Sequence, residues 1–203
     1  MDVNKVIARA KSMLLTPRSE WPVVAAEPET VGGLYSSYIL LVAAIPSVAL
    51  FLSTAVVGVS VPFLGTYYRV GIATALTRAI LGYVLALVGV YVVALIVEAF
   101  APTFGAEKNR TQALKAVAYS YTAYWVISIV GVIPGLALLA ALAGAIYSVY
   151  LLNMGLPFTM KCPTDKAIGY TAVTVLVAIV VFFVLGLVVG SVAGVDPGMT
   201  RAP

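Results

Sequence analysis

The feature that most constrains this chain is a series of five long apolar runs, each of 20 residues or more. About 20 mainly apolar residues in a helix cross the roughly 30 Å hydrocarbon core of a bilayer. The runs are continuous rather than alternating, which indicates helices and not barrel strands. We therefore expect an all-α polytopic membrane protein with five transmembrane helices. The predicted spans cover residues 34–57, 76–101, 114–133, 136–156 and 168–195.

The composition excludes a soluble globular domain and most kinds of metal site and catalytic site. Of the 203 residues, 62% are hydrophobic and 10% are charged, whereas soluble domains have about 45–50% apolar and about 25% charged residues. The chain contains no histidine and a single cysteine, Cys162. The sequence therefore predicts no metal site and no cofactor. Because no nucleophile is paired with a general base, we expect no catalytic residues and no enzyme activity.

Lysine and arginine are unevenly distributed between the two ends of the expected bundle. Nine lie in the N-terminal segment and in the loops after the second and fourth spans, and three lie on the other side. Because these residues accumulate in short cytoplasmic loops, we expect a cytoplasmic N-terminus and an external C-terminus. This distribution is typical of the orientation of spans in a membrane and not of a nucleic-acid-binding patch, so we expect no nucleic-acid partner.

The segment before the first span has its own pattern. Residues 1–31 are predicted to be cytoplasmic, residues 32–195 to contain the bundle, and residues 196–203 to form a short external tail. Apolar residues recur at helical spacing up to Thr16, ahead of Pro17, which predicts a short amphipathic helix. This helix is either an anchor on the cytoplasmic leaflet or a docking helix for a partner or a curved membrane. The candidate partner or membrane surface comprises Lys5, Arg9, Lys11 and Trp21.

Two connections carry further expectations. The residues 132–135, Val-Ile-Pro-Gly, predict a tight helical hairpin between the third and fourth spans. The loop 58–75 contains Pro62 and several aromatic residues, which suit the membrane interface. The alternatives for this loop are a re-entrant segment and a short surface helix.

Several motifs together resemble the prokaryotic branch of the Yip family (Ypt-interacting proteins). The first is Leu-Leu-Thr-Pro-Arg-Ser-Glu-Trp-Pro at 14–22, followed by Glu27. The others are residues 116–121, Ile133-Pro134, residues 146–152, Gly155 and residues 165–171. The resemblance implies a five-helix integral membrane protein with a cytoplasmic N-terminus, in the inner membrane of a prokaryotic cell. Eukaryotic relatives are linked to Rab-type GTPases and vesicle traffic.

One acidic residue, Glu98, lies inside a predicted span, and ionisable groups at membrane depth indicate function by default. Glu98 lies four residues before Pro102, about 6 Å of helix rise from the end of the span. It could instead pair with Lys108, Arg110 or Lys115. The predicted cytoplasmic-side polar pocket comprises Glu98, Lys115, Tyr119, Tyr147, Tyr150 and Asn153. The alternative is an aromatic belt with ordinary interhelical hydrogen bonds.

Small residues repeat along the fifth span, where Gly186, Gly190 and Gly194 are spaced by four. Such a ridge lets helices approach closely within lipid. We expect it to serve helix packing within the bundle, with a homo-oligomer as the alternative.

Two classes of function remain. One is a non-enzymatic membrane organiser or adaptor that binds protein partners or lipid, which the resemblance favours. The other is a small transporter or channel for a small solute, using the pocket around Glu98. The expected partners are thus the lipid bilayer, with a membrane-protein partner, a second copy or a solute left open.

Overall fold

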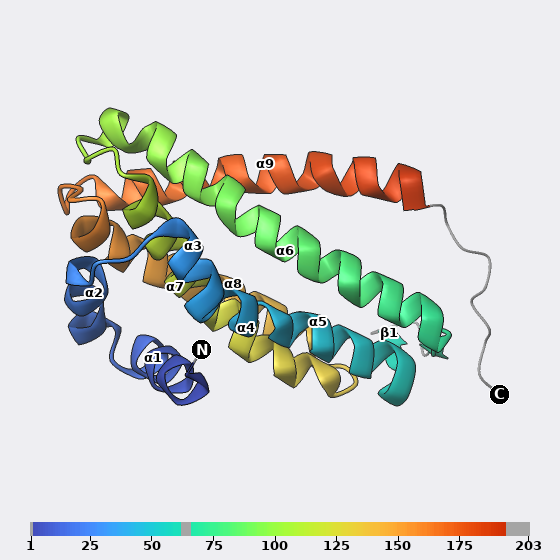
Figure 1. Ribbon diagram of the computed structural model, residues 1–203. Helices are drawn as coiled ribbons and strands as arrows, with labels where there is room; N and C mark the ends of the chain where they lie inside the picture. Colours follow the sequence, from blue (N-terminus) through green and yellow to red (C-terminus); the bar gives the residue numbers. More distant parts are fainter. Residues whose placement is uncertain (1, 62–65, 194–203) are drawn as a thin grey trace.

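The computed structural model describes residues 2–61 and 66–193 and is a bundle of long helices (Figure 1). Among the described residues, five helical segments are long and apolar enough to cross a membrane, which confirms the predicted fold class. They are Val31–Val57, Ile72–Phe104, Arg110–Val132, Ala137–Thr159 and Ala167–Val184. The protein is therefore an integral membrane protein whose solvent is the lipid bilayer.

Two helices precede the first span. Helix α1 (Val3–Leu15) begins after Asp2, whose carboxylate accepts hydrogen bonds from two backbone N–H groups of the first turn. Helix α1 is followed by Thr16, and helix α2 (Pro17–Ala26) begins at the next residue. Proline is favourable at the first helical position because the N–H group it lacks would have no partner there.

The first span is helical throughout but irregular. It consists of α3 (Val31–Leu34), the π-helical segment η1 (Tyr35–Ile39), α4 (Leu40–Val42), α5 (Ala44–Phe51) and the π-helical segment η2 (Leu52–Val57). The regular pattern breaks at Ala43, one turn before Pro46. Pro46 has no N–H group to donate to the carbonyl of Val42, so the interruption lies where the proline requires it.

A short hairpin follows the first span. Strands β1 (Val59–Val61) and β2 (Thr66–Tyr68) pair in antiparallel fashion, with Ser60 opposite Tyr67. The described part of the loop 58–75 therefore contains strands where a short surface helix had been one expectation. The chain enters the hairpin through Gly58, whose φ of 99° favours glycine.

The remaining spans are regular helices joined by short connections. They are α6 (Ile72–Phe100) with the 3-10 turn η3 (Ala101–Phe104), α7 (Arg110–Ile127) with the 3-10 turn η4 (Ser128–Val132), α8 (Ala137–Thr159) and α9 (Ala167–Ala193). Gly135 adopts a φ of 85° within the predicted hairpin turn between α7 and α8. Only glycine enters this left-handed region without a steric cost, so the Pro-Gly pair allows the chain to reverse.

Helix α7 forms the centre of the bundle. In its most apolar stretch 61% of the residues are buried within the protein, compared with 22–28% in the other four spans. It packs against α6, α8 and α1. We call the end of the bundle that holds α2 and the loops after η3 and α8 the Lys/Arg-rich end; it lies on the left in Figure 1.

Candidate functional site

Helix α2 is held on the bundle by hydrogen bonds from α7 to carbonyl groups at its C-terminal end. Lys115, which is 2% exposed, places Nζ 2.8 Å from the carbonyl oxygen of Val24 and also donates to the carbonyl of Glu27. Gln112 Nε2 donates to the carbonyl of Ala25 over 2.9 Å. The last carbonyls of a helix lack internal partners and carry partial negative charge. The buried ammonium of Lys115 therefore binds a helix end.

An aromatic residue of α2 fills a space that glycine leaves on α8. Trp21 is fully buried, and its ring lies over Gly155. A Cβ atom added at Gly155 would lie only 2.6 Å from Cζ2 of Trp21. Only glycine permits this contact, so two motifs far apart in the sequence meet at one point of the fold.

Helices α1 and α2 are joined to each other by charge. The guanidinium of Arg9 forms ion pairs with the carboxylates of Glu20 and Glu27. Burial of the guanidinium lowers the pKa of Arg9, but the hydrogen bond and charge of Glu27, together with the charge of Glu20, outweigh burial and raise it. The hydroxyl of Tyr147 on α8 donates to the carbonyl of Leu14 over 2.7 Å and fixes the end of α1.

The four residues of the predicted partner or membrane surface therefore divide into two pairs. Lys5 and Lys11 are exposed on α1. Arg9 points between the two helices, and Trp21 is buried against α8. Of these four residues, Lys5 and Lys11 are therefore the two that are open to a partner.

The six residues of the predicted polar pocket make separate contacts. Glu98 Oε2 lies 2.8 Å from Arg110 Nε, which is one of the three pairings expected from the sequence. Lys115 binds the end of α2 instead. Tyr119 packs on Tyr38 with 4.7 Å between ring centroids.

The other members of that set lie further along α8. Tyr147 and Tyr150 stack on each other with their ring centroids 5.7 Å apart. Asn153 Nδ2 donates to Thr171 Oγ1 on α9 over 3.4 Å. Glu98, Lys115, Tyr119 and Asn153 thus have partners outside the set, whereas Tyr147 and Tyr150 contact each other, and the action of the six as one site stays a prediction.

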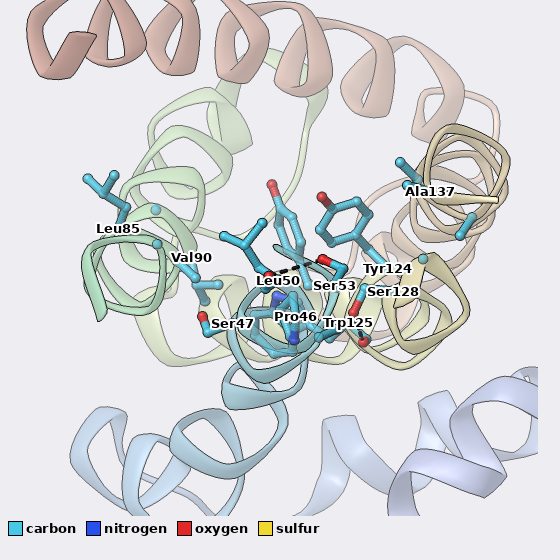
Figure 2. Close-up of a pocket in the computed structure, with 18 of the residues that line it drawn as sticks. Pro46, Ser47, Leu50, Ser53, Leu85, Val90, Tyr124, Trp125, Ser128 and Ala137 are labelled. Carbon is cyan, nitrogen blue, oxygen red and sulfur yellow. Dashed lines mark hydrogen bonds between the residues drawn. The ribbon is translucent and has the colours of Figure 1, made fainter. Parts of the chain in front are cut away.

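Three cavities lie in the described part of the bundle, and the second of them is lined by Tyr147 and Tyr150 of the predicted pocket. The first, of about 540 Å³, is formed by the first span, α6, α7 and α8, and Figure 2 shows Pro46, Ser53, Tyr124 and Ser128 around it. The second, of about 970 Å³, lies between the α1–α2 turn and α8. The third, of about 280 Å³, lies between α6, α7, α8 and α9. Glu98 lines none of these three cavities.

A comparison with family models shows to which family this chain belongs. The model of the Yip1 domain matches residues 11–185. This chain belongs to the Yip1 domain family. Inner membrane protein YohC of Escherichia coli strain K12 is 27% identical over 172 residues, which cover 83% of this chain and 87% of the relative. The protein of the same name from Escherichia coli O6:H1 strain CFT073 gives the same values. No solved structure matches.

The Yip1 match includes the contacts that hold α2 in place. Trp21, Lys115 and Gly155 all lie within residues 11–185, whereas Lys5 and Arg9 precede the match. The docking of α2 on α7 and α8 is thus a contact within the family domain.

The glycine ridge of the fifth span follows the match. Gly186 and Gly190 lie in α9, but the surroundings of side chains on this helix are described only up to residue 184. Gly194 lies outside the described residues. Their use in helix packing stays a prediction.

Several residues of this region were not found by sequence reasoning. Gln112 and the buried hydroxyls of Ser120 and Thr174 gave no signal, since polar residues of these types usually hydrogen-bond within their own helix. The role of Gly155 had been visible only as a member of the family motif.

Proposed function

We propose that this Yip1-domain protein is a non-enzymatic membrane organiser or adaptor that binds protein partners or lipid through α1. The observation that carries the proposal is a stripe on the outward side of α1 formed by Val3, Ile7, Lys11 and Leu15, here called the α1 stripe. Residues four apart share one face of a helix. Val3, Ile7 and Leu15 are 53%, 60% and 69% exposed, and Lys11 is exposed between them.

Rigid attachment supports the use of this stripe as a binding surface. The opposite side of α1 buries Val6 and Met13 against the bundle. Because Arg9 and Tyr147 hold the helix in place, the entropy cost of ordering α1 when a partner binds is reduced. An apolar stripe with a central cation fits a partner that is apolar and acidic, or the surface of an anionic membrane.

The orientation is part of the proposal. The Lys/Arg-rich end carries nine of the twelve basic residues, so we infer that it faces the cytoplasm. Inner membrane protein YohC is a relative, which supports an inner-membrane location for this chain. The α1 stripe would then lie at the cytoplasmic surface of that membrane.

The alternative of transport through a pocket at Glu98 has less support. Glu98 is paired with Arg110, and it does not line the three cavities described above. A carboxylate at a helix end that is satisfied by a neighbouring guanidinium fits a structural role.

Site-specific photo-crosslinking in native membranes tests the adaptor proposal. A photoreactive residue replaces Ile7 or Leu15, and a matched control replaces Ile168, an exposed apolar residue on α9. We expect the same adducts at Ile7 and Leu15, their loss on adding Lys11→Glu, and their absence at Ile168. Identical adducts at all three positions that persist in Lys11→Glu would contradict the proposal.

A further inference from the structure

The cavity of about 280 Å³ is a crevice open to the bilayer. Its mouth is formed by Val149 on α8 and by Ile179 and Phe182 on α9, all of them exposed. Its inner end is formed by buried residues of α7 and α9, among them Ser120 and Thr174. A molecule dissolved in the bilayer can therefore enter from the side, between α8 and α9.

Two hydroxyl groups at the inner end are buried without a partner. Ser120 is 2% exposed and Thr174 is 0% exposed, and neither hydroxyl has a hydrogen-bond partner among the described residues. Other buried threonines of the bundle differ, because Thr122 and Thr159 donate to the carbonyl four residues earlier. A buried polar group normally has a partner, so these two hydroxyls indicate a missing one.

Depth and charge restrict what that partner can be. Ser120 lies ten residues after the start of α7, about 15 Å along the helix, and Thr174 lies seven residues after the start of α9, about 10 Å along it. Both are well inside a hydrocarbon layer of about 30 Å. All residues that the structure places around the cavity are uncharged. An ionised headgroup would be buried there without a counter-charge, which is unfavourable.

We propose that this crevice binds an uncharged lipid whose polar group bears carbonyl oxygens, in the manner of a long-chain quinone. Rotation of the Ser120 and Thr174 side chains toward the crevice lets their hydroxyls donate to the carbonyls, and the apolar tail leaves between α8 and α9. The volume of about 280 Å³ is just below the range of about 300–1,000 Å³ that is usual for small-molecule sites, so the cavity holds the polar head and not a whole lipid. This inference is independent of the adaptor role of α1.

Binding of decylubiquinone, a short-chain quinone, to the purified full-length protein tests the proposal. Trp125 stacks on Tyr121, a wall of the crevice, with 5.8 Å between ring centroids. Trp125 itself lines the cavity of about 540 Å³, and Trp21 also fluoresces. Quenching is therefore measured in a Trp21→Phe background, and the Ser120 and Thr174 variants assign it to the crevice. We expect Ser120→Ala and Thr174→Val each to weaken binding about three- to tenfold, as the loss of one hydrogen bond does. The matched control is Thr54→Val, since Thr54 is a buried threonine outside the crevice.

A second measurement separates lost recognition from lost folding. Without quinone, Ser120→Ala and Thr174→Val should keep or raise the Tm, because each replaces an unpartnered hydroxyl by an apolar group. Competition with dodecane should leave the quenching unchanged. Three results would overturn the proposal: no quenching of the wild-type protein, equal binding by the double variant, or full displacement by dodecane.

Discussion

Replacing Gly155 by alanine should release α2 from the bundle. The added Cβ would lie 2.6–2.8 Å from three ring atoms of Trp21, well inside van der Waals contact. Overpacking of this kind costs about 1–3 kcal/mol. Because the clash exists only while α2 is docked, the cost falls on the docked form. The ratio of docked to undocked protein should therefore drop by about 5- to 150-fold.

Tryptophan fluorescence and thermal unfolding measure this effect. The chain has two tryptophans, so Trp125→Phe leaves Trp21 as the only reporter. In that background Gly155→Ala should shift the emission of Trp21 to longer wavelength, since the ring passes from a buried site to a more polar one. In the native background Gly155→Ala should lower the Tm, and a smaller ring in Trp21→Phe should restore part of the loss.

The control is Gly82→Ala on α6. Apart from the backbone of α6 itself and the adjoining residues, nothing lies within 4 Å of a Cβ added there, so this change should have no effect or stabilise the helix slightly. The reasoning fails if Gly155→Ala leaves both the emission and the Tm unchanged, or if Gly82→Ala has the same effect.

Three further predictions concern charged residues. Lys115→Met keeps the length of the side chain but leaves buried carbonyls of α2 without donors, so the free energy of unfolding should fall by about 1.5–3 kcal/mol in denaturant titrations. The exposed Lys108→Met should leave it unchanged. Glu98→Gln should cost no more than about 1 kcal/mol in the same assay, because the side chain of Arg110 is 51% exposed; a larger loss, or altered solute flux in proteoliposomes, would favour the transport alternative. In a variant without the native cysteine, a membrane-impermeant maleimide should label Arg69→Cys in intact cells and Lys108→Cys only after lysis. The reverse pattern would invert the proposed topology.

The spans could be predicted because the length of apolar runs leaves few choices. Residues 114–156 would form a single helix of 43 residues without the Pro134-Gly135 turn, which is too long for a bilayer. The structure has a left-handed glycine at that turn. The contact of Glu98 with Arg110 was likewise one of the three pairings expected from the sequence. The rise of the helix places Glu98 near the end of its span, which limits its partners to residues close to that end.

The partner of Lys115 could not be predicted in this way. Charge patterns suggest acidic side chains as partners, but Lys115 binds backbone carbonyls about 90 residues earlier in the chain. Every residue has a carbonyl, so no residue type marks the end of a helix as the partner. The orphan hydroxyls present the same difficulty, because Ser120 and Thr122 lie on one helix and only the second has a partner.

The contact between Trp21 and Gly155 also shows that part of the N-terminal segment packs into the bundle. A glycine in a span predicts the close approach of another span, but Gly155 receives a ring from a helix that precedes the first span. With the bonds from Lys115 and Gln112, this contact makes α2 part of the bundle. Helix α1 follows because Arg9 joins it to α2. The two helices pack on the bundle with one side and expose the α1 stripe on the other. A change that loosens α2 therefore removes one of the supports of the α1 stripe and leaves the contacts of α1 with α7 and with Tyr147.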